Sequence, residues 1–92
     1  MEKEALYREA AKKWGDKSQI YMLAEECCEL AHAAHHLLRD AKNTAHFAEE
    51  IADVEIMIEQ AVSLLKDPYL RPTIERFKKV KLERLEETLL KA

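Results

Sequence analysis

The sequence predicts an all-α protein, and its composition and the spacing of its apolar residues are the two observations that predict it. One glycine and two prolines in 92 residues leave little of the turn chemistry that β-hairpins require. Alanine, leucine, glutamate and lysine are abundant, and all four favour helices. A chain of this length suits one domain, so we expect residues 1–92 to form a single helical domain.

The first two helices are expected on either side of the only glycine. Apolar residues recur at helical spacing over residues 3–13, which predicts a short first helix. Gly15 falls where a glycine commonly ends a helix. The second helix is expected over about residues 17–39, with Asp16 or Ser18 as its N-cap and Asp16 the better placed of the two.

The third and fourth helices are separated by the two prolines. The third helix is expected over about residues 44–66, capped by Asn43 or Thr44. Each proline disfavours helix in the residue before it, which predicts a connector over residues 67–71. The fourth helix is expected over about residues 72–90, because a proline is tolerated in a first helical turn.

The two long helices each carry a pair of acids, Glu26 with Glu29 and Glu50 with Asp53. Residues three apart lie about 60° apart on a helix, and both pairs fall on the same edge of an apolar stripe. Antiparallel packing of the two stripes would bring the four carboxylates together beside an apolar cleft, with the hairpin apex within residues 39–43. The stripes comprise Ile20, Leu23, Cys27, Leu30, Ala34 and Leu38 on the second helix, and Phe47, Ile51, Val54, Ile58, Val62 and Leu65 on the third.

Four converging carboxylates require a cation or a proton. At about 4 Å, each like-charge pair costs roughly 1 kcal/mol in water and about 4 kcal/mol at a partly buried site. Oxygen ligands without a thiolate favour Mg²⁺, Mn²⁺ or Ca²⁺. This pattern predicts hydrolysis of a phosphate compound by metal-activated water.

At these acids the sequence resembles the MazG-like, all-α nucleoside triphosphate pyrophosphohydrolases. Their motif is a Glu-rich pair, a spacer and then Glu-x-x-Asp. Weaker similarity is found upstream and downstream, and the resemblance covers about residues 5–88. The residues that carry it are Glu25-Glu26-Cys27-Cys28-Glu29, Glu49-Glu50-Ile51-Ala52-Asp53, Trp14-Gly15, Gln19 and Lys81-Leu82-Glu83-Arg84.

The resemblance implies a four-helix bundle, completed as a homodimer or homotetramer, that cleaves a (d)NTP between the α and β phosphates. It implies Mg²⁺, with Mn²⁺ as a substitute, and Lys81 and Arg84 on the substrate phosphates. The general base would be Glu25, Glu26 or Glu29, and a base pocket would involve Trp14, Gln19 and Met22, although Trp14 also suits a core position. The implied metal ligands are Glu26, Glu29, Glu50 and Asp53.

Other interpretations of the same residues are open. A non-catalytic helical interaction module, or a degenerate nucleotide-binding member of the family, is the main alternative. Glu29-Leu-Ala-His32 matches half of a di-iron motif, and His32 and His36 are spaced one helical turn apart, as zinc ligands can be. Lys81 also suits an edge position at which its stem packs and its ammonium group is solvated.

Charge and composition argue against several classes of partner. A net charge of −3 gives no general attraction to nucleic acid, and the chain has no apolar run of about 18 residues that would predict a membrane span. Cys27 and Cys28 are adjacent, which disfavours a disulfide between them, and Cys27 is expected in the core. We expect a cytoplasmic protein whose thin core is completed by further copies of itself.

Overall fold

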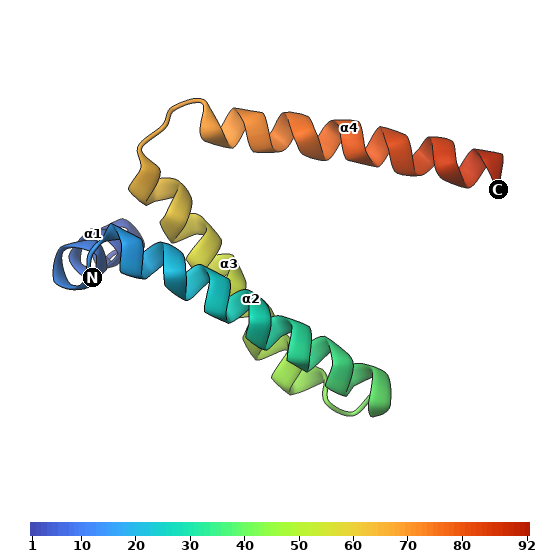
Figure 1. Cartoon of the computed structure of the whole chain (residues 1–92), viewed down its shortest axis with the longest axis horizontal. Coiled ribbons are helices and arrows are strands. Elements are labelled where there is room, and N and C mark those ends of the chain that lie inside the picture. Colours follow the sequence, from blue (N-terminus) through green and yellow to red (C-terminus); the bar gives the residue numbers. More distant parts are fainter.

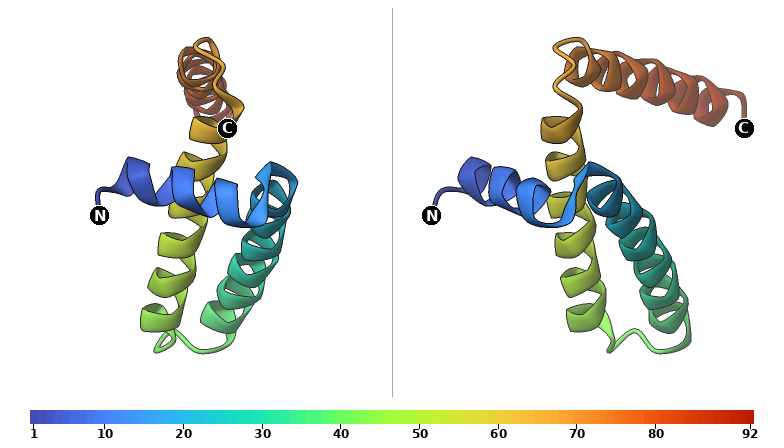
Figure 2. Two further views of the ribbon diagram at one scale, coloured as in Figure 1. Left: turned by 90° about the vertical axis from the view of Figure 1, so that its left-hand side faces the viewer. Right: turned by 60° about the vertical axis from the view of Figure 1, so that its left-hand side comes forward.

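Two long antiparallel helices form the body of the protein. The computed structural model describes residues 1–92, and all of its regular structure is helical, as the sequence predicts (Figure 1). Helices α2 and α3 lie side by side as a hairpin, α1 crosses the open end of that hairpin, and α4 extends away from it (Figure 2). The helices are α1 (Lys3–Trp14), α2 (Asp16–Arg39), α3 (Thr44–Leu65) and α4 (Leu70–Lys91).

A single residue, Gly15, both ends α1 and begins α2. Its φ of 87° lies in the region that glycine tolerates best. The Gly15 N–H donates to the Ala11 carbonyl at 2.8 Å, and the Gly15 carbonyl accepts from the Gln19 N–H at 3.2 Å. The expectation that Asp16 caps α2 is wrong, because Asp16 is already helical and no side chain caps this helix start.

The hairpin apex lies in the polar stretch where the sequence predicts it. The Lys42 N–H donates to the Asp40 carboxylate at 3.0 Å, which closes a local turn. Asn43 occupies the N-cap position of α3, although its side chain makes no capping bond there. Instead its amide lies 3.4 Å from the His36 carbonyl and donates back to the end of α2.

Small residues allow α2 and α3 to approach closely. Ala33 has no exposed surface, and Ala61 and Val54 are buried opposite α2. The buried face of α2 is nevertheless rotated from the predicted stripe. Gln19 and Ala33 lie within about 20° of Glu26 on the helix surface and are both buried. Glu26 therefore faces the partner helix rather than flanking the contact.

The other edge of the predicted stripe is left in solvent. Cys27 is exposed, so the expectation that it belongs to the core is wrong. The physical reason is the rotation, which turns apolar side chains on one side of each helix away from the hairpin contact. The stripe residues left exposed include Ile20, Leu38, Ile58 and Leu65.

Helix α1 is held across the hairpin by Tyr7. The Tyr7 ring is buried, and its hydroxyl donates to the Glu59 carboxylate at 2.9 Å. The Lys3 ammonium group lies 3.0 Å from the same carboxylate. Next to this contact, buried Gln60 on α3 donates a hydrogen bond to buried Gln19 on α2.

Helix α4 contributes no buried residue to the chain, and only seven of 92 residues are buried in all. Lys66, with a φ of 51°, ends α3, and the segment after it leads α4 away from the hairpin (Figure 1). Three helices therefore pack together within one chain, while a bundle of four stays a prediction. No helix combines the length and apolar character needed to cross a membrane. The large apolar residues exposed on α4 are Phe77, Val80, Leu82, Leu85, Leu89 and Leu90.

The Glu59 contacts predict a pH-dependent stability. The hydrogen bond from Lys3, and then that from Tyr7, lower the pKa of Glu59 below its ordinary value of 4.5. Its ionised form therefore stabilises the fold fully above that ordinary value, and the contribution is lost as the pH falls through the lowered pKa. The free energy of unfolding of Glu59→Gln should fall below that of the natural chain at pH 7, and the difference should shrink below about pH 4.5.

Urea denaturation at a series of pH values measures this difference. Glu55→Gln is the matched control, because Glu55 is an exposed acid on the same helix without an ion pair. A Glu59→Gln deficit that stays constant from pH 7 to pH 3 would contradict the proposed ionic origin.

Candidate metal centre

Three of the predicted acids converge between the two long helices. Glu26 comes from α2, and Glu50 and Asp53 come from α3. One carboxylate oxygen of each lies within 4.8 Å of the others. Glu50 is buried, whereas Glu26 and Asp53 are partly exposed. The cluster is thus open to solvent on one side and closed on the other.

Glu50 is the acid that the fold has desolvated most. Glu50 is 8% exposed, and its Oε2 atom is buried without a hydrogen-bond partner. A buried polar atom without a partner is costly, and an ionised one more so. A cation ligated by this oxygen would remove that cost, so the residues present fit a metal ion.

The electrostatics at Glu26 reflect the same crowding. Burial raises the pKa of Glu26 above its ordinary value of 4.5, and the charges of Asp53, Glu50 and Glu29 raise it further. Without a cation, the crowding thus disfavours the ionised form of Glu26. A bound divalent cation would reverse this preference, because it stabilises the ionised form of each ligand.

The set of donor atoms favours hard cations. Carboxylate oxygens suit Mg²⁺, Mn²⁺ and Ca²⁺, and Mg²⁺ is commonly held by one or two carboxylates together with water and phosphate oxygens. Glu29, the fourth predicted ligand, is exposed and lies outside the cluster, as does Glu25. The structure therefore brings together three of the four acids and leaves two neighbouring carboxylates at its edge.

The histidines lie apart from this centre. His32, His35, His36 and His46 are all exposed, and none is part of the three-carboxylate cluster. The rings of His36 and His46 have their centroids 6.2 Å apart at the hairpin turn. The di-iron and zinc interpretations thus gain no support from the position of the acids.

A cavity of about 430 Å³ lies one helical turn from the acids. Met22 precedes Glu26 by four residues, and Met57 follows Asp53 by four residues. All three residues predicted for a base pocket line this cavity. Trp14 is 59% exposed, so it forms a wall of the cavity rather than part of the core. The lining residues are Ala10, Trp14, Ser18, Gln19, Met22, Met57 and Gln60.

The α3 side of this cavity is not among the features predicted from the sequence. Met57 and Gln60 stand four and seven residues after Asp53, which is the spacing of one face of a helix. That spacing is the signal in the sequence that places Met57 and Gln60 on the same side of α3 as Asp53. Lys81 and Arg84, in contrast, are exposed on α4, which extends away from the α2–α3 hairpin within the chain (Figure 1).

No protein-family model, curated protein or solved structure matches this chain. The fold and the cluster define an all-α protein with an acidic centre suited to a divalent cation. The site itself and the motif in the sequence are therefore the features that bear on its function.

The buried, unpaired charge of Glu50 predicts that this centre destabilises the metal-free chain. Glu50→Gln removes one negative charge from the cluster and keeps the side-chain shape. In buffer containing EDTA, its free energy of unfolding should equal or exceed that of the natural chain, by a gain on the order of 1 kcal/mol. Chemical denaturation gives the comparison.

Glu49→Gln is the control, because Glu49 is the exposed neighbour of Glu50 on α3. It should change the stability little. A marked loss of stability in Glu50→Gln would show that the carboxylate has a protein partner that stabilises it.

Proposed function

We propose that the protein hydrolyses a nucleoside triphosphate between its α and β phosphates, giving the monophosphate and pyrophosphate, with Mg²⁺ or Mn²⁺ as cofactor. The observation that carries the proposal is the cluster of Glu26, Glu50 and Asp53, with its buried unpaired oxygen, beside the cavity lined by Trp14. The motif resemblance at the same acids supports the same reaction.

The cluster can hold the cation from two helices at once. Glu26, Glu50 and Asp53 would be its protein ligands, and Glu29 lies one helical turn from Glu26 at the solvent edge. Bound Mg²⁺ supplies positive charge that offsets the charge of the phosphates and favours ionisation of water. Proton transfer and binding of the substrate are carried out by the chain's own side chains.

Proton transfer requires a carboxylate close to the attacking water. Water attacks the α phosphorus, the bond between that phosphorus and the bridging oxygen breaks, and pyrophosphate leaves. The proton of the water passes to Glu25, Glu26 or Glu29. Glu25 and Glu29 lie outside the three-carboxylate cluster, which leaves their oxygens free to accept a proton.

The cavity beside the acids suits a nucleobase. Trp14, Met22 and Met57 offer flat or adaptable apolar surface. The hydrogen bond from Gln60 to Gln19 leaves the Gln19 amide N–H groups and the Gln60 carbonyl oxygen for the edge of a base. The volume of about 430 Å³ lies within the ordinary range of small-molecule sites.

The cations for the phosphates are proposed to come from a second copy of the chain. Helix α4 carries seven basic and four acidic side chains, whereas α2 and α3 together carry nine acidic and two basic ones. The exposed apolar residues of α4 would pack on a partner's hairpin, and the opposite charges favour that docking. Lys81 and Arg84 would then reach the partner's acid centre in a homodimer or homotetramer.

A non-catalytic role is the second candidate. The exposed apolar face of α4 favours it, because an unpaired amphipathic helix also suits a different partner protein. The two functions are distinguished by divalent cation binding and turnover, which an interaction module does not require.

The reaction predicts a defined pair of products. A panel of ribo- and deoxyribonucleoside triphosphates is incubated with Mg²⁺, and the products are separated by chromatography. They should be nucleoside monophosphate and pyrophosphate, without nucleoside diphosphate. Hydrolysis in ¹⁸O-water should label the monophosphate, because the water oxygen joins the α phosphorus. Release of inorganic phosphate and a diphosphate would refute the mechanism.

Two variants connect this activity to the acids. Asp53→Asn should lose turnover while keeping its helical content by circular dichroism, and Glu55→Gln on the same helix should keep both. Glu50→Gln should lose turnover together with the rise in melting temperature that Mg²⁺ causes by binding the folded chain. If Glu50→Gln keeps that rise, Glu50 is not a ligand.

The proposed assembly predicts complementation between inactive copies. Light scattering at micromolar concentration should give twice or four times the 10.7 kDa mass of the chain. Asp53→Asn and Arg84→Ala should each be inactive alone, but mixing them should restore turnover, because some sites then combine an intact cluster with an intact α4.

A mixture of Asp53→Asn with Glu50→Gln is the matched control, and it should stay inactive since both changes affect the cluster. A mass of 10.7 kDa would overturn the assembly. If the chain is oligomeric but the mixture of Asp53→Asn and Arg84→Ala recovers no activity, α4 does not contribute to the partner's site.

A further inference from the structure

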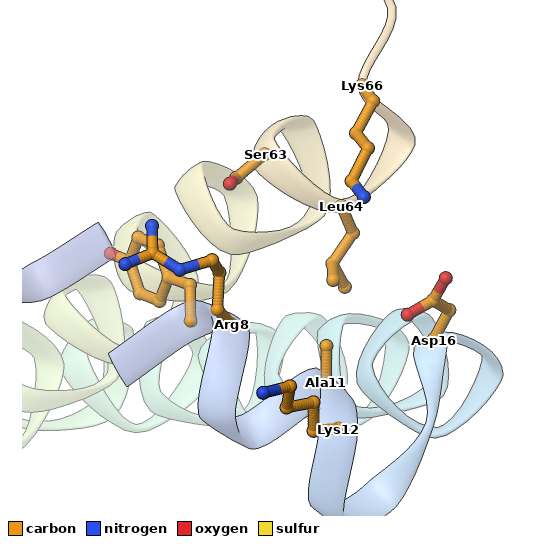
Figure 3. A pocket seen from close by; sticks show the side chains of 8 residues that line it. Arg8, Ala11, Lys12, Asp16, Ser63, Leu64 and Lys66 are labelled. Atoms are coloured by element: carbon orange, nitrogen blue, oxygen red, sulfur yellow. The ribbon is translucent and has the colours of Figure 1, made fainter. Parts of the chain in front are cut away.

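A second cavity lies on the other side of α1 from the acid cluster. Its volume is about 320 Å³, and it is an open cavity bordered by α1, the start of α2 and the end of α3 (Figure 3). The residues that line it at the end of α3, Ser63 and Leu64 with Lys66 just after the helix, begin ten residues beyond Asp53. At 1.5 Å per residue this separates the cavity from the acids by about 15 Å along the helix.

The walls of this cavity are basic in an acidic protein. Arg8, Lys12 and Lys66 line it together with one acid, Asp16, whereas the whole chain has a net charge of −3. Arg8 and Lys66 form no ion pair with the protein, and Lys12 has only exposed Glu9 at 3.8 Å. Three side-chain cations, two from α1 and one from the residue after α3, thus border one cavity without a matching number of anions.

Further donors lie at the same place. The start of α2, where Asp16 lines the cavity, has no side-chain cap, and the first N–H of this helix to donate within the chain is that of Gln19. The positive end of the α2 dipole therefore adds to the field at the cavity edge. The Ser63 hydroxyl also faces the cavity region and makes no side-chain hydrogen bond (Figure 3).

We propose that this basic cavity binds the phosphate group of a small phosphorylated ligand, independently of the acid cluster. Arg8 supplies a planar fork that matches two phosphate oxygens, and Lys12 and Lys66 supply mobile point charges from opposite walls. Asp16 opposes the anion and limits its affinity. The ligand is either pyrophosphate itself or the phosphate end of a mononucleotide, since both present the same oxyanion chemistry.

Calorimetric titrations with pyrophosphate, AMP and adenosine test the site. They are carried out in EDTA, so that binding to the acid cluster through a divalent cation does not contribute. Pyrophosphate or AMP should bind the natural chain and Glu50→Gln equally, while adenosine should not bind. If pyrophosphate binds more tightly than AMP, the ligand is pyrophosphate; if AMP binds more tightly, the ligand is a mononucleotide.

Variants of the cavity walls separate a site from general charge attraction. Arg8→Gln and Lys66→Gln should each weaken binding about tenfold or more, as expected for the loss of a charged hydrogen bond. Arg8→Lys should weaken it less, and Asp16→Asn should tighten it. Lys79→Gln, which removes an exposed cation of α4, should leave it unchanged; circular dichroism checks that each variant is folded.

Three results would overturn the proposal. The first is the absence of phosphate binding to the natural chain. The second is an equal loss of binding in Lys79→Gln and Arg8→Gln, which would indicate attraction to net charge alone. The third is equally strong binding of adenosine, which would show that the cavity does not recognise phosphate.

Discussion

The burial of Glu50 between α2 and α3 is the constraint to which the rest of the structure responds. A carboxylate that is 8% exposed and has an unpaired oxygen stands where a helical pair ordinarily packs an apolar side chain. The small buried residues Ala33 and Ala61, at separate levels of the hairpin, let the two helices lie near enough for Glu26 and Asp53 to crowd that charge. The buried carboxylate thus lowers the stability of the fold at this centre, which is characteristic of a functional site.

Much of the fold follows directly from the sequence. The four helices have boundaries within about two residues of those expected, because Gly15, the polar turn at Asp40 and Pro68 interrupt strong helical periodicity. The connector expected over residues 67–71 is wrong at its end, because α4 already begins at Leu70 and accepts Pro72 in its first turn. The convergence of acids from both long helices also follows from periodicity, since it depends only on 100° per residue and on the position of the hairpin apex. Glu26, Glu50 and Asp53 meet for that reason.

Other features depend on information that periodicity does not contain. The apolar stripes give a direction for each helix, but the closest packing is decided by small residues, and Ala33 and Ala61 rotate the contact toward the acids. Cys27 is consequently exposed. The direction of α4 is likewise set after Lys66, where a left-handed backbone turns the chain, and spacing within a helix says nothing about such a turn. Predicting the α3 wall of the Trp14 cavity requires knowing where α1 crosses the hairpin.

Helix α1 is a partition with a compartment on each side. Ala10 and Trp14 face one, and Arg8 and Lys12 face the other. Tyr7 fastens the partition to Glu59, while the single residue Gly15 joins it to α2. A ligand on one side that tilts this helix about Gly15 would strain the Tyr7–Glu59 hydrogen bond and change the other side. Any free-energy coupling between the two compartments acts equally in both directions.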